Sequence, residues 1–171
     1  MMRLLRSLKA DRSGSAAVEM ALVLPILLAL MLGAVDLGNY FLSEHVVDKA
    51  VRDAARYAAR LPLAAYDCGA GTMVDPSKVQ KLARTGDPAG TQARLAGWTD
   101  DTMTSVSVNC DTDSTHVYVN GGIYGDFPNG GEAPTVTVSA TVPYNSFFGA
   151  LGLGKLTANL NATSQAAVIG A

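Results

Sequence analysis

Residues 20–35 read MALVLPILLALMLGAV, a run without a charged or amide side chain that sets the class of the whole chain. Extended to residues 16–42, the run is interrupted only by Glu19, Asp36 and Asn39. A helix needs about 20 apolar residues to cross a hydrocarbon core, whereas the apolar part of a removable signal peptide has only about 7–15. The sequence therefore predicts a transmembrane helix over residues 15–42.

The residues before this helix are basic. Against the single acid Asp11 stand four cationic side chains, namely Arg3, Arg6, Lys9 and Arg12. Cationic flanks stay in the cytoplasm, so the N-terminus is expected to be cytoplasmic and residues from about 43 onward extracytoplasmic.

Composition excludes several other classes. At 171 residues and 49% hydrophobic, the chain offers one modest domain, which is too short for a (β/α)₈ barrel. From residue 14 onward there are 9 basic and 14 acidic side chains, a balance of −5 that argues against a nucleic-acid partner.

Two residues of the predicted span are unusual for a plain anchor. Pro25 is tolerated in a spanning helix and is expected to kink it. Glu19 is either hydrated at the cytoplasmic headgroups or functional, because an ionisable group at the start of a span is costly unless something pairs with it. If the chain were cut after Gly14, Glu19 would be the fifth residue of the product and would lie one helical turn from the new α-amino group of Ser15. The carboxylate could then neutralise that amine in its own chain or in a neighbouring subunit.

The run GSAAVEMALVLPILLALMLGAVDLGNYF, preceded by KADRS, resembles the N-terminus of the TadE-like pseudopilins of the tight-adherence (Flp) pilus, within the type IV prepilin class. The resemblance is strong over residues 9–60 and loose beyond them. It departs from the family at Met20, where an aromatic residue is common. It implies that residues 1–14 are a basic prepilin leader, cleaved between Gly14 and Ser15 by a prepilin peptidase, with Glu19 as the position-five glutamate. It also implies an apolar helix kept in the bacterial inner membrane, with other pilins or pseudopilins and the inner-membrane assembly platform as partners.

Residues 43–61 are expected to continue the helix as an extracytoplasmic stalk, which Pro62 ends because the residue before a proline is pushed out of the helical region. Apolar residues at 47, 51, 54 or 55, and 58 form one stripe along it. The stripe either packs against neighbouring subunits or packs on the protein's own domain, and the residue pattern leaves both open.

Residues 62–171 are expected to form an extracytoplasmic α+β domain. Two Asp-Pro starts predict short helices from residues 75 and 87. Alternating β-branched residues then predict strands at 104–109, 115–120 and 134–144, with a weaker one at 156–170, and residues 145–154 between them read as an apolar loop or one helical turn. The fold class is thus α+β: a long N-terminal helix followed by a small antiparallel sheet with one or two short helices.

Cys68 and Cys110 are expected to form one disulfide, which the extracytoplasmic side permits. Two free buried thiols are the alternative. A metal pair is disfavoured because neither cysteine has a second Cys or His at ligand spacing.

No motif of the sequence carries catalytic chemistry. His45 and His116 lie outside any known constellation, and the acidic run at 111–115 lacks the glycine and distal glutamate of a calcium-binding EF-hand loop. We therefore expect no enzyme, no cofactor and no metal. The resemblance implies a minor pilin-like subunit that supports assembly or stability of a tight-adherence pilus, and so surface attachment. The alternative is an unprocessed single-pass membrane protein with an extracytoplasmic binding domain.

Overall fold

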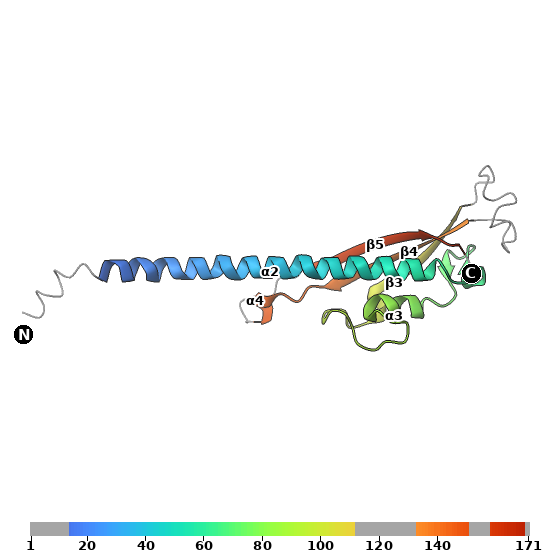
Figure 1. Ribbon diagram of the computed structural model, residues 1–171. Helices are drawn as coiled ribbons and strands as arrows, with labels where there is room; N and C mark the ends of the chain where they lie inside the picture. Colours follow the sequence, from blue (N-terminus) through green and yellow to red (C-terminus); the bar gives the residue numbers. More distant parts are fainter. Residues whose placement is uncertain (1–13, 112–132, 151–157, 170–171) are drawn as a thin grey trace, which may run out of the picture. The chain divides into compact units, whose positions relative to one another are not determined.

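The structure is a computed structural model and describes residues 14–111, 133–150 and 158–169. The chain divides into two compact units, residues 1–39 and residues 40–171. The long helix α2, Gly14–Ala58, contributes its first part to one unit and its last part to the other (Figure 1). The predicted continuous helix is therefore confirmed, but it ends at Ala58, three residues before the predicted end at residue 61, and a turn leads from it to Pro62.

The second unit contains a three-stranded antiparallel sheet in the order β3-β4-β5. Its strands are β3, Thr104–Asp111, β4, Ala133–Pro143, and β5, Asn159–Ala167. They correspond to three of the four predicted strands, and the fourth, at 115–120, lies outside the described residues. The register places Val138 opposite both Val106 and Ser164. The predicted α+β class is confirmed.

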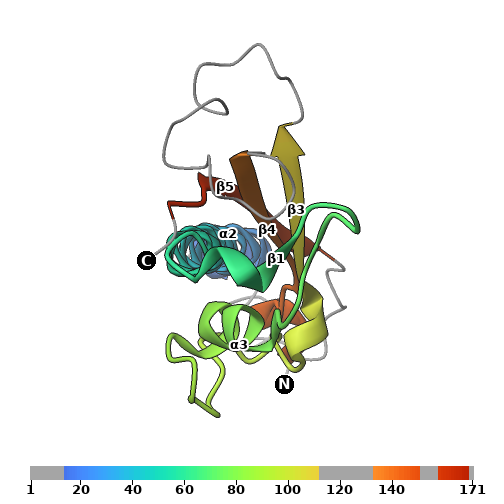
Figure 2. The same ribbon diagram turned by 90° about the vertical axis from the view of Figure 1, so that its right-hand side faces the viewer.

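Alternation along β4 gives the sheet one apolar and one polar face. Val136, Val138, Ala140 and Val142 are buried, whereas the alternate residues 137, 139 and 141 are partly or wholly exposed. The last part of α2 covers the apolar face (Figure 2). This one-sided burial is typical of an antiparallel sheet with one face in water.

One of the two predicted short helices is present. Helix α3, Ser77–Thr85, follows the first Asp-Pro pair, and Asp75 Oδ1 accepts hydrogen bonds from the backbone N–H and hydroxyl of Ser77. These bonds lower the pKa of Asp75. Gly86 ends the helix in the left-handed conformation at φ 87°, and its N–H donates to the Leu82 carbonyl.

The helix predicted from residue 87 does not form. Asp87 and Gly90 close a single turn, after which the Arg94 N–H donates to the Arg84 carbonyl at 2.8 Å. Further along, Gly97 lies so close to the Pro143 carbonyl of β4 that any Cβ would overlap it. The conformation of residues 87–97 is thus determined by contacts with α3 and β4. These contacts outweigh the helix-starting tendency of the Asp-Pro pair.

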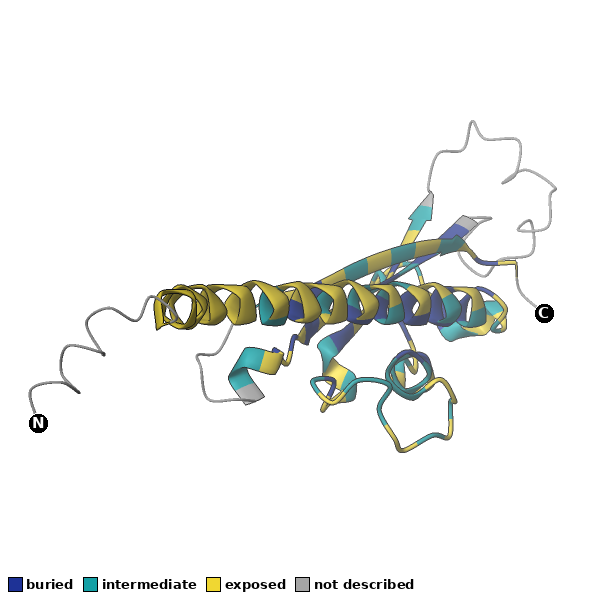
Figure 3. Ribbon diagram, turned by 60° about the vertical axis from the view of Figure 1, so that its left-hand side comes forward, coloured by how far each residue is buried: buried dark blue, intermediate teal, exposed yellow. Residues whose placement is uncertain are grey.

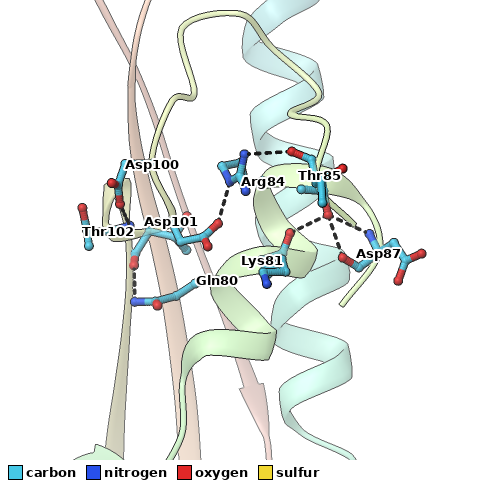
Figure 4. Close-up of polar contacts among 10 residues, drawn as sticks. Gln80, Lys81, Arg84, Thr85, Asp87, Asp100, Asp101 and Thr102 are labelled. Carbon is cyan, nitrogen blue, oxygen red and sulfur yellow. Dashed lines mark hydrogen bonds and ion pairs between the residues drawn. The ribbon is translucent and has the colours of Figure 1, made fainter. Parts of the chain in front are cut away.

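Side chains of α3 hold it to the start of β3 (Figure 4). Arg84 Nε donates to Asp101 Oδ1 at 2.5 Å, and Gln80 Nε2 donates to the Thr104 carbonyl at 2.9 Å. Asp101 belongs to η2, Asp101–Met103, a 3₁₀ turn capped by the Asp100 side chain.

Three short elements complete the described chain. The turn η1, Leu63–Ala65, leads into a hairpin of β1, Tyr66–Asp67, and β2, Thr72–Met73, which the sequence did not predict. The predicted apolar loop or helical turn at 145–154 contains α4, Phe147–Ala150, a single turn.

Candidate functional site: the anchoring helix and its entry into the domain

The first part of α2, residues 14–39, exposes apolar side chains on every side. Residues 14–31 are all exposed and are coloured so in Figure 3, and of the remaining residues to 39 only 32, 33 and 36 are partly or fully buried. The large apolar side chains that are at least 46% exposed between residues 18 and 37 are Val18, Met20, Leu22, Val23, Leu24, Ile26, Leu27, Leu28, Leu30, Met31, Val35 and Leu37. A helix that is apolar all round requires an apolar surrounding.

This helix is long and apolar enough to cross a membrane. Its most apolar 18-residue window has a mean hydropathy of 2.4 and is not buried. Within the described residues it is the one helix that satisfies this test. Because residues 16–42 would span about 40 Å at about 1.5 Å per residue, α2 fits a membrane anchor.

Gly14 is the first residue of α2, and Ser15 and Glu19 lie on its first turns. All three are exposed. A Cβ built on Gly14 meets no heavy atom within 4 Å, so local packing does not require glycine there. Ser15 and Glu19 are four residues apart and therefore share one face of the helix.

Pro25 lies inside the continuous helix. Its missing N–H removes one intrahelical bond, and a spanning helix tolerates this loss better than a short soluble one. The predicted kink at Pro25 stays a prediction.

The last part of α2, from Tyr40, packs on the protein's own sheet. The predicted stripe is at most 1% exposed at Val47, Val51, Ala54, Ala55 and Ala58, and Ala50, which was not predicted, is buried with it. Where the helix enters the domain, the Tyr40 and Tyr144 rings meet edge to face at 5.2 Å, and beyond its end the Ile169 N–H donates to the Ala59 carbonyl at 2.9 Å. The second interpretation of the stripe is therefore correct, and small side chains let the helix approach the strands closely.

The opposite face of this part of α2 is charged. Lys49, Arg52 and Arg56 are exposed, as is Arg60 in the turn after the helix, and Arg52 pairs with Asp48 one turn earlier. Asp53 lies 4.0 Å from Arg94, which follows α3. Within the described residues, no ion pair engages Arg56 or Arg60.

The structure joins Cys68 and Cys110 by a disulfide with a Cα–Cα distance of 5.5 Å. Cys68 directly follows β1 and Cys110 belongs to β3, so the bond fastens the unpredicted hairpin to the sheet. The Val108 N–H donates to the Gly71 carbonyl at 3.0 Å beside it. Of the two alternatives for the cysteines, the bridged one is present.

Tyr66 of β1 is a structural residue that sequence reasoning missed. Its hydroxyl donates to the Ala58 carbonyl in the last turn of α2, and its ring is 6% exposed. Burial raises the pKa of Tyr66 to about 12. The sequence pattern could not have predicted this hydrogen bond, because it joins two different elements, β1 and α2. Only the aromatic character of Tyr66 could have indicated that the residue is buried.

The described part of the chain contains no group of three or more His, Cys, Asp or Glu side chains that could hold a metal ion. His45 is exposed on α2, and His116 lies outside the described residues, as does most of the acidic run at 111–115.

Fold and helix together define a protein whose apolar N-terminal helix fits a membrane anchor and continues into a small α+β domain. The helix also resembles a known protein family: the model of the TadE-like protein family matches residues 14–56. The match begins with the first residue of α2 and ends two residues before its last. The predicted resemblance to a TadE-like pilus protein is confirmed over this segment. No curated protein and no solved structure matches the chain.

Proposed function

We propose that this protein is a minor pilin-like subunit, a pseudopilin, that supports assembly or stability of a tight-adherence pilus and thereby surface attachment. The observation that carries the proposal is an apolar helix, exposed over residues 14–31, that matches the TadE-like family from Gly14 onward and carries Glu19 five residues further along. In this proposal residues 1–14 are a leader, residues 15–42 span the bacterial inner membrane and the rest lies outside the cytoplasm.

The first step is hydrolysis of the Gly14–Ser15 peptide bond by a prepilin peptidase. The open space around Gly14 offers no packing reason for a glycine there. Cleavage explains the glycine: the peptidase must approach the backbone at residue 14 closely, and a residue without a side chain permits this.

The second step concerns the charge created by cleavage. Hydrolysis leaves an α-amino group on Ser15, and Glu19 lies one helical turn away on the same face. An ammonium and a carboxylate in apolar surroundings are costly separately and much less costly as a pair. Glu19 therefore lets the new N-terminus enter a bundle of apolar helices.

The third step is transfer of the helix from lipid into the pilus by the inner-membrane platform. Gly33 and Gly38 have open space where a side chain would stand, so neighbouring helix backbones can approach there. The disulfide supports placement of the domain in an oxidising compartment outside the cytoplasm.

Intact mass of the membrane-extracted protein, from cells with and without a prepilin peptidase, tests the proposal. We expect a chain that starts at Ser15 only when the peptidase is present, and full-length chain when Gly14 is replaced by leucine. Gly33→Ala is the matched control, because it changes another open glycine of the same helix and should leave cleavage intact.

Glu19→Ala separates processing from assembly. The variant should lose at least tenfold of its recovery in sheared pili, whereas Glu19→Asp should retain most of it. Full-length chain in both strains would reject the proposal in favour of an unprocessed, single-pass anchored binding domain.

A further inference from the structure

The second unit exposes few large apolar side chains, and most of them lie at one end of it. Within its described residues five are exposed, namely Phe41, Leu42, Val74, Phe147 and Ile169. Single exposed apolar residues are normal on a protein surface, whereas several at one place mark an interaction surface. Three of the five, Phe41, Leu42 and Phe147, belong to the end of the unit where α2 enters it.

Strand β4 runs along the last part of α2 in the opposite direction. Near its start the Pro134 carbonyl accepts a hydrogen bond from the Val168 N–H, and the residue after Val168 donates to the Ala59 carbonyl beyond the end of α2. Just after its end, the Tyr144 ring packs against the Tyr40 ring, with centroids 5.2 Å apart. The chain that leaves β4 therefore continues away from Ala59, and Figure 1 shows α4 beyond this end of β4.

The same end of the unit lies where the proposed span leaves the hydrocarbon core. A core takes about 20 residues of helix, and a count of 20 from Met20, the first residue after Glu19, ends at Asn39. Tyr40 is then at the level of the headgroups, where tyrosine rings are enriched because they have an apolar body and a polar hydroxyl. Glu44, the next charged side chain, comes one helical turn further, where water hydrates it.

The segment that contains α4 has the composition of an element at a membrane surface. Residues 143–150 include no charged side chain, and two aromatic residues, Phe147 and Phe148, begin the single turn. Phe147 is 45% exposed. The Gly149 N–H donates to the Ser146 hydroxyl at 2.9 Å, so this backbone donor needs no water. Such a turn can lie at the boundary between headgroups and acyl chains.

The directions of the exposed side chains favour a bilayer over a protein partner. Phe41 and Leu42 are neighbours in sequence and point about 100° apart around the helix axis, and Phe147 lies on a separate element. A protein that docks on one side of this end would cover only part of the group. A bilayer surrounds the helix on every side at one height, so it covers all three side chains at once.

We propose that α4 is a second membrane contact of this protein. The Phe147 side chain inserts between headgroups and acyl chains of the extracytoplasmic leaflet, at the level of Tyr40 and Phe41, and holds the domain against the bilayer. The inference rests on the part of the proposed function that places residues 15–42 across the membrane. It deepens that function by naming the lipid surface as a partner of the domain, which must be released when the helix leaves the membrane.

Quenching of tryptophan fluorescence by brominated lipids tests the contact. Full-length chain carrying Phe147→Trp is reconstituted, at no more than one chain per vesicle, in phosphatidylcholine and phosphatidylglycerol with or without bromine near the headgroup end of the acyl chains. We expect bromine to reduce the emission of the new tryptophan about twofold, because indole rings reside at this depth. The native Trp98 is fully buried in the domain and gives the background.

Val74→Trp is the matched control. Val74 is 72% exposed, but its N–H bonds to the Ala65 carbonyl beyond the other end of α2, so its tryptophan should not be quenched. Equal emission of the Phe147→Trp chain in both lipids would overturn the inference. Quenching that appears only at many chains per vesicle would assign this surface to a second copy and would overturn it as well.

A measurement on the native chain avoids any effect of substitution on folding. In nanodiscs whose lipids carry a nitroxide on the headgroup, the Gly149 amide signal of ¹⁵N-labelled protein should lose about half of its intensity, because an interfacial element lies within about 10 Å of the headgroups. The Val108 amide, which lies opposite Val136 near the start of β4, should keep its intensity. An unbroadened Gly149 signal would contradict the contact.

Cleavage at Gly14, read by intact mass, keeps the two proposals apart. If the chain is processed but position 147 is not quenched, the lipid contact is wrong while the proposed function stands. If the chain is never processed but position 147 is quenched, the pilin-like function fails while the membrane contact stands, since the contact requires only that the helix spans the bilayer.

Discussion

The buried hydroxyl of Thr104 lowers the stability of the fold. Its side chain is fully buried at the start of β3, and its Oγ1 has no hydrogen-bond partner within the described residues. A buried hydroxyl without a partner costs about 1–3 kcal/mol. We expect Thr104→Val to raise the free energy of unfolding by about 1 kcal/mol, because valine has the same shape without the polar atom.

The denaturation midpoint of the detergent-solubilised chain measures this change. Thr104→Ser is the control, because it keeps the hydroxyl and loses the methyl group, and it should be less stable than the native protein. A valine variant as destabilised as the serine variant would show that the hydroxyl has a partner.

Tyr66 makes the stability of the folded chain depend on pH in the alkaline range. In the folded chain the phenol donates to the Ala58 carbonyl and its pKa is raised to about 12, whereas an unfolded tyrosine titrates near pH about 10. The contribution of the neutral phenol is thus complete below about pH 10 and is lost as the pH rises towards about 12.

Tyr66→Phe should cost about 0.5–1.5 kcal/mol at neutral pH, because it removes one buried hydrogen bond, while the Ala58 carbonyl keeps the bond that it accepts from the Leu61 N–H. The advantage of the native protein over this variant should shrink between pH 10 and 11.5 in denaturant titrations. Tyr57→Phe, on a partly exposed tyrosine of α2, is the control. An advantage that stays constant with pH would contradict the raised pKa.

At the scale of elements, the disulfide determines whether the β1–β2 hairpin stays on the sheet. Each strand of the hairpin has two residues, too few to be stable alone, and the bridge closes a loop of 42 residues. In the chain-entropy description a loop of this length is worth about 4 kcal/mol.

Replacing Cys68 and Cys110 together by alanine should therefore lower the free energy of unfolding by about 2–4 kcal/mol. It should also speed hydrogen exchange at the Val108 amide, which bonds to Gly71 of the hairpin. The Val138 amide, in the central strand, serves as the internal control. Unchanged exchange at Val108 would mean that packing alone holds the hairpin.

At the scale of the whole molecule, the apolar helix determines where the protein resides. Each arginine at the centre of a span costs about 2.5–3.5 kcal/mol on insertion scales. Leu24→Arg with Leu28→Arg should therefore move most of the protein out of the membrane pellet after an alkaline carbonate wash. Leu24→Phe with Leu28→Phe should leave it in the pellet, and equal retention of both variants would contradict an anchoring role.

Much of this protein follows from local sequence. The apolar run of residues 20–35 can only be a helix that is apolar all round, and the alternation at 104–109 and 134–144 predicted strands β3 and β4 because period-two patterns have one buried face. The motif from Gly14 to Glu19 is also local, since its residues lie within two helical turns of one another, and its role in processing stays a prediction.

Tertiary structure decided the rest. Whether Val47 and Ala54 face their own domain or a neighbour depends on where β4 and β5 lie, and no local pattern encodes that position. The segment from residue 87 has helix-start residues, yet Gly97 must lie against Pro143 of β4, and that contact prevails. Tyr66 reaches Ala58, and Cys68 reaches Cys110, across elements distant in sequence. Such long-range contacts exist only once the sheet and helix have packed, so the sequence alone determined the elements, and packing determined their partners.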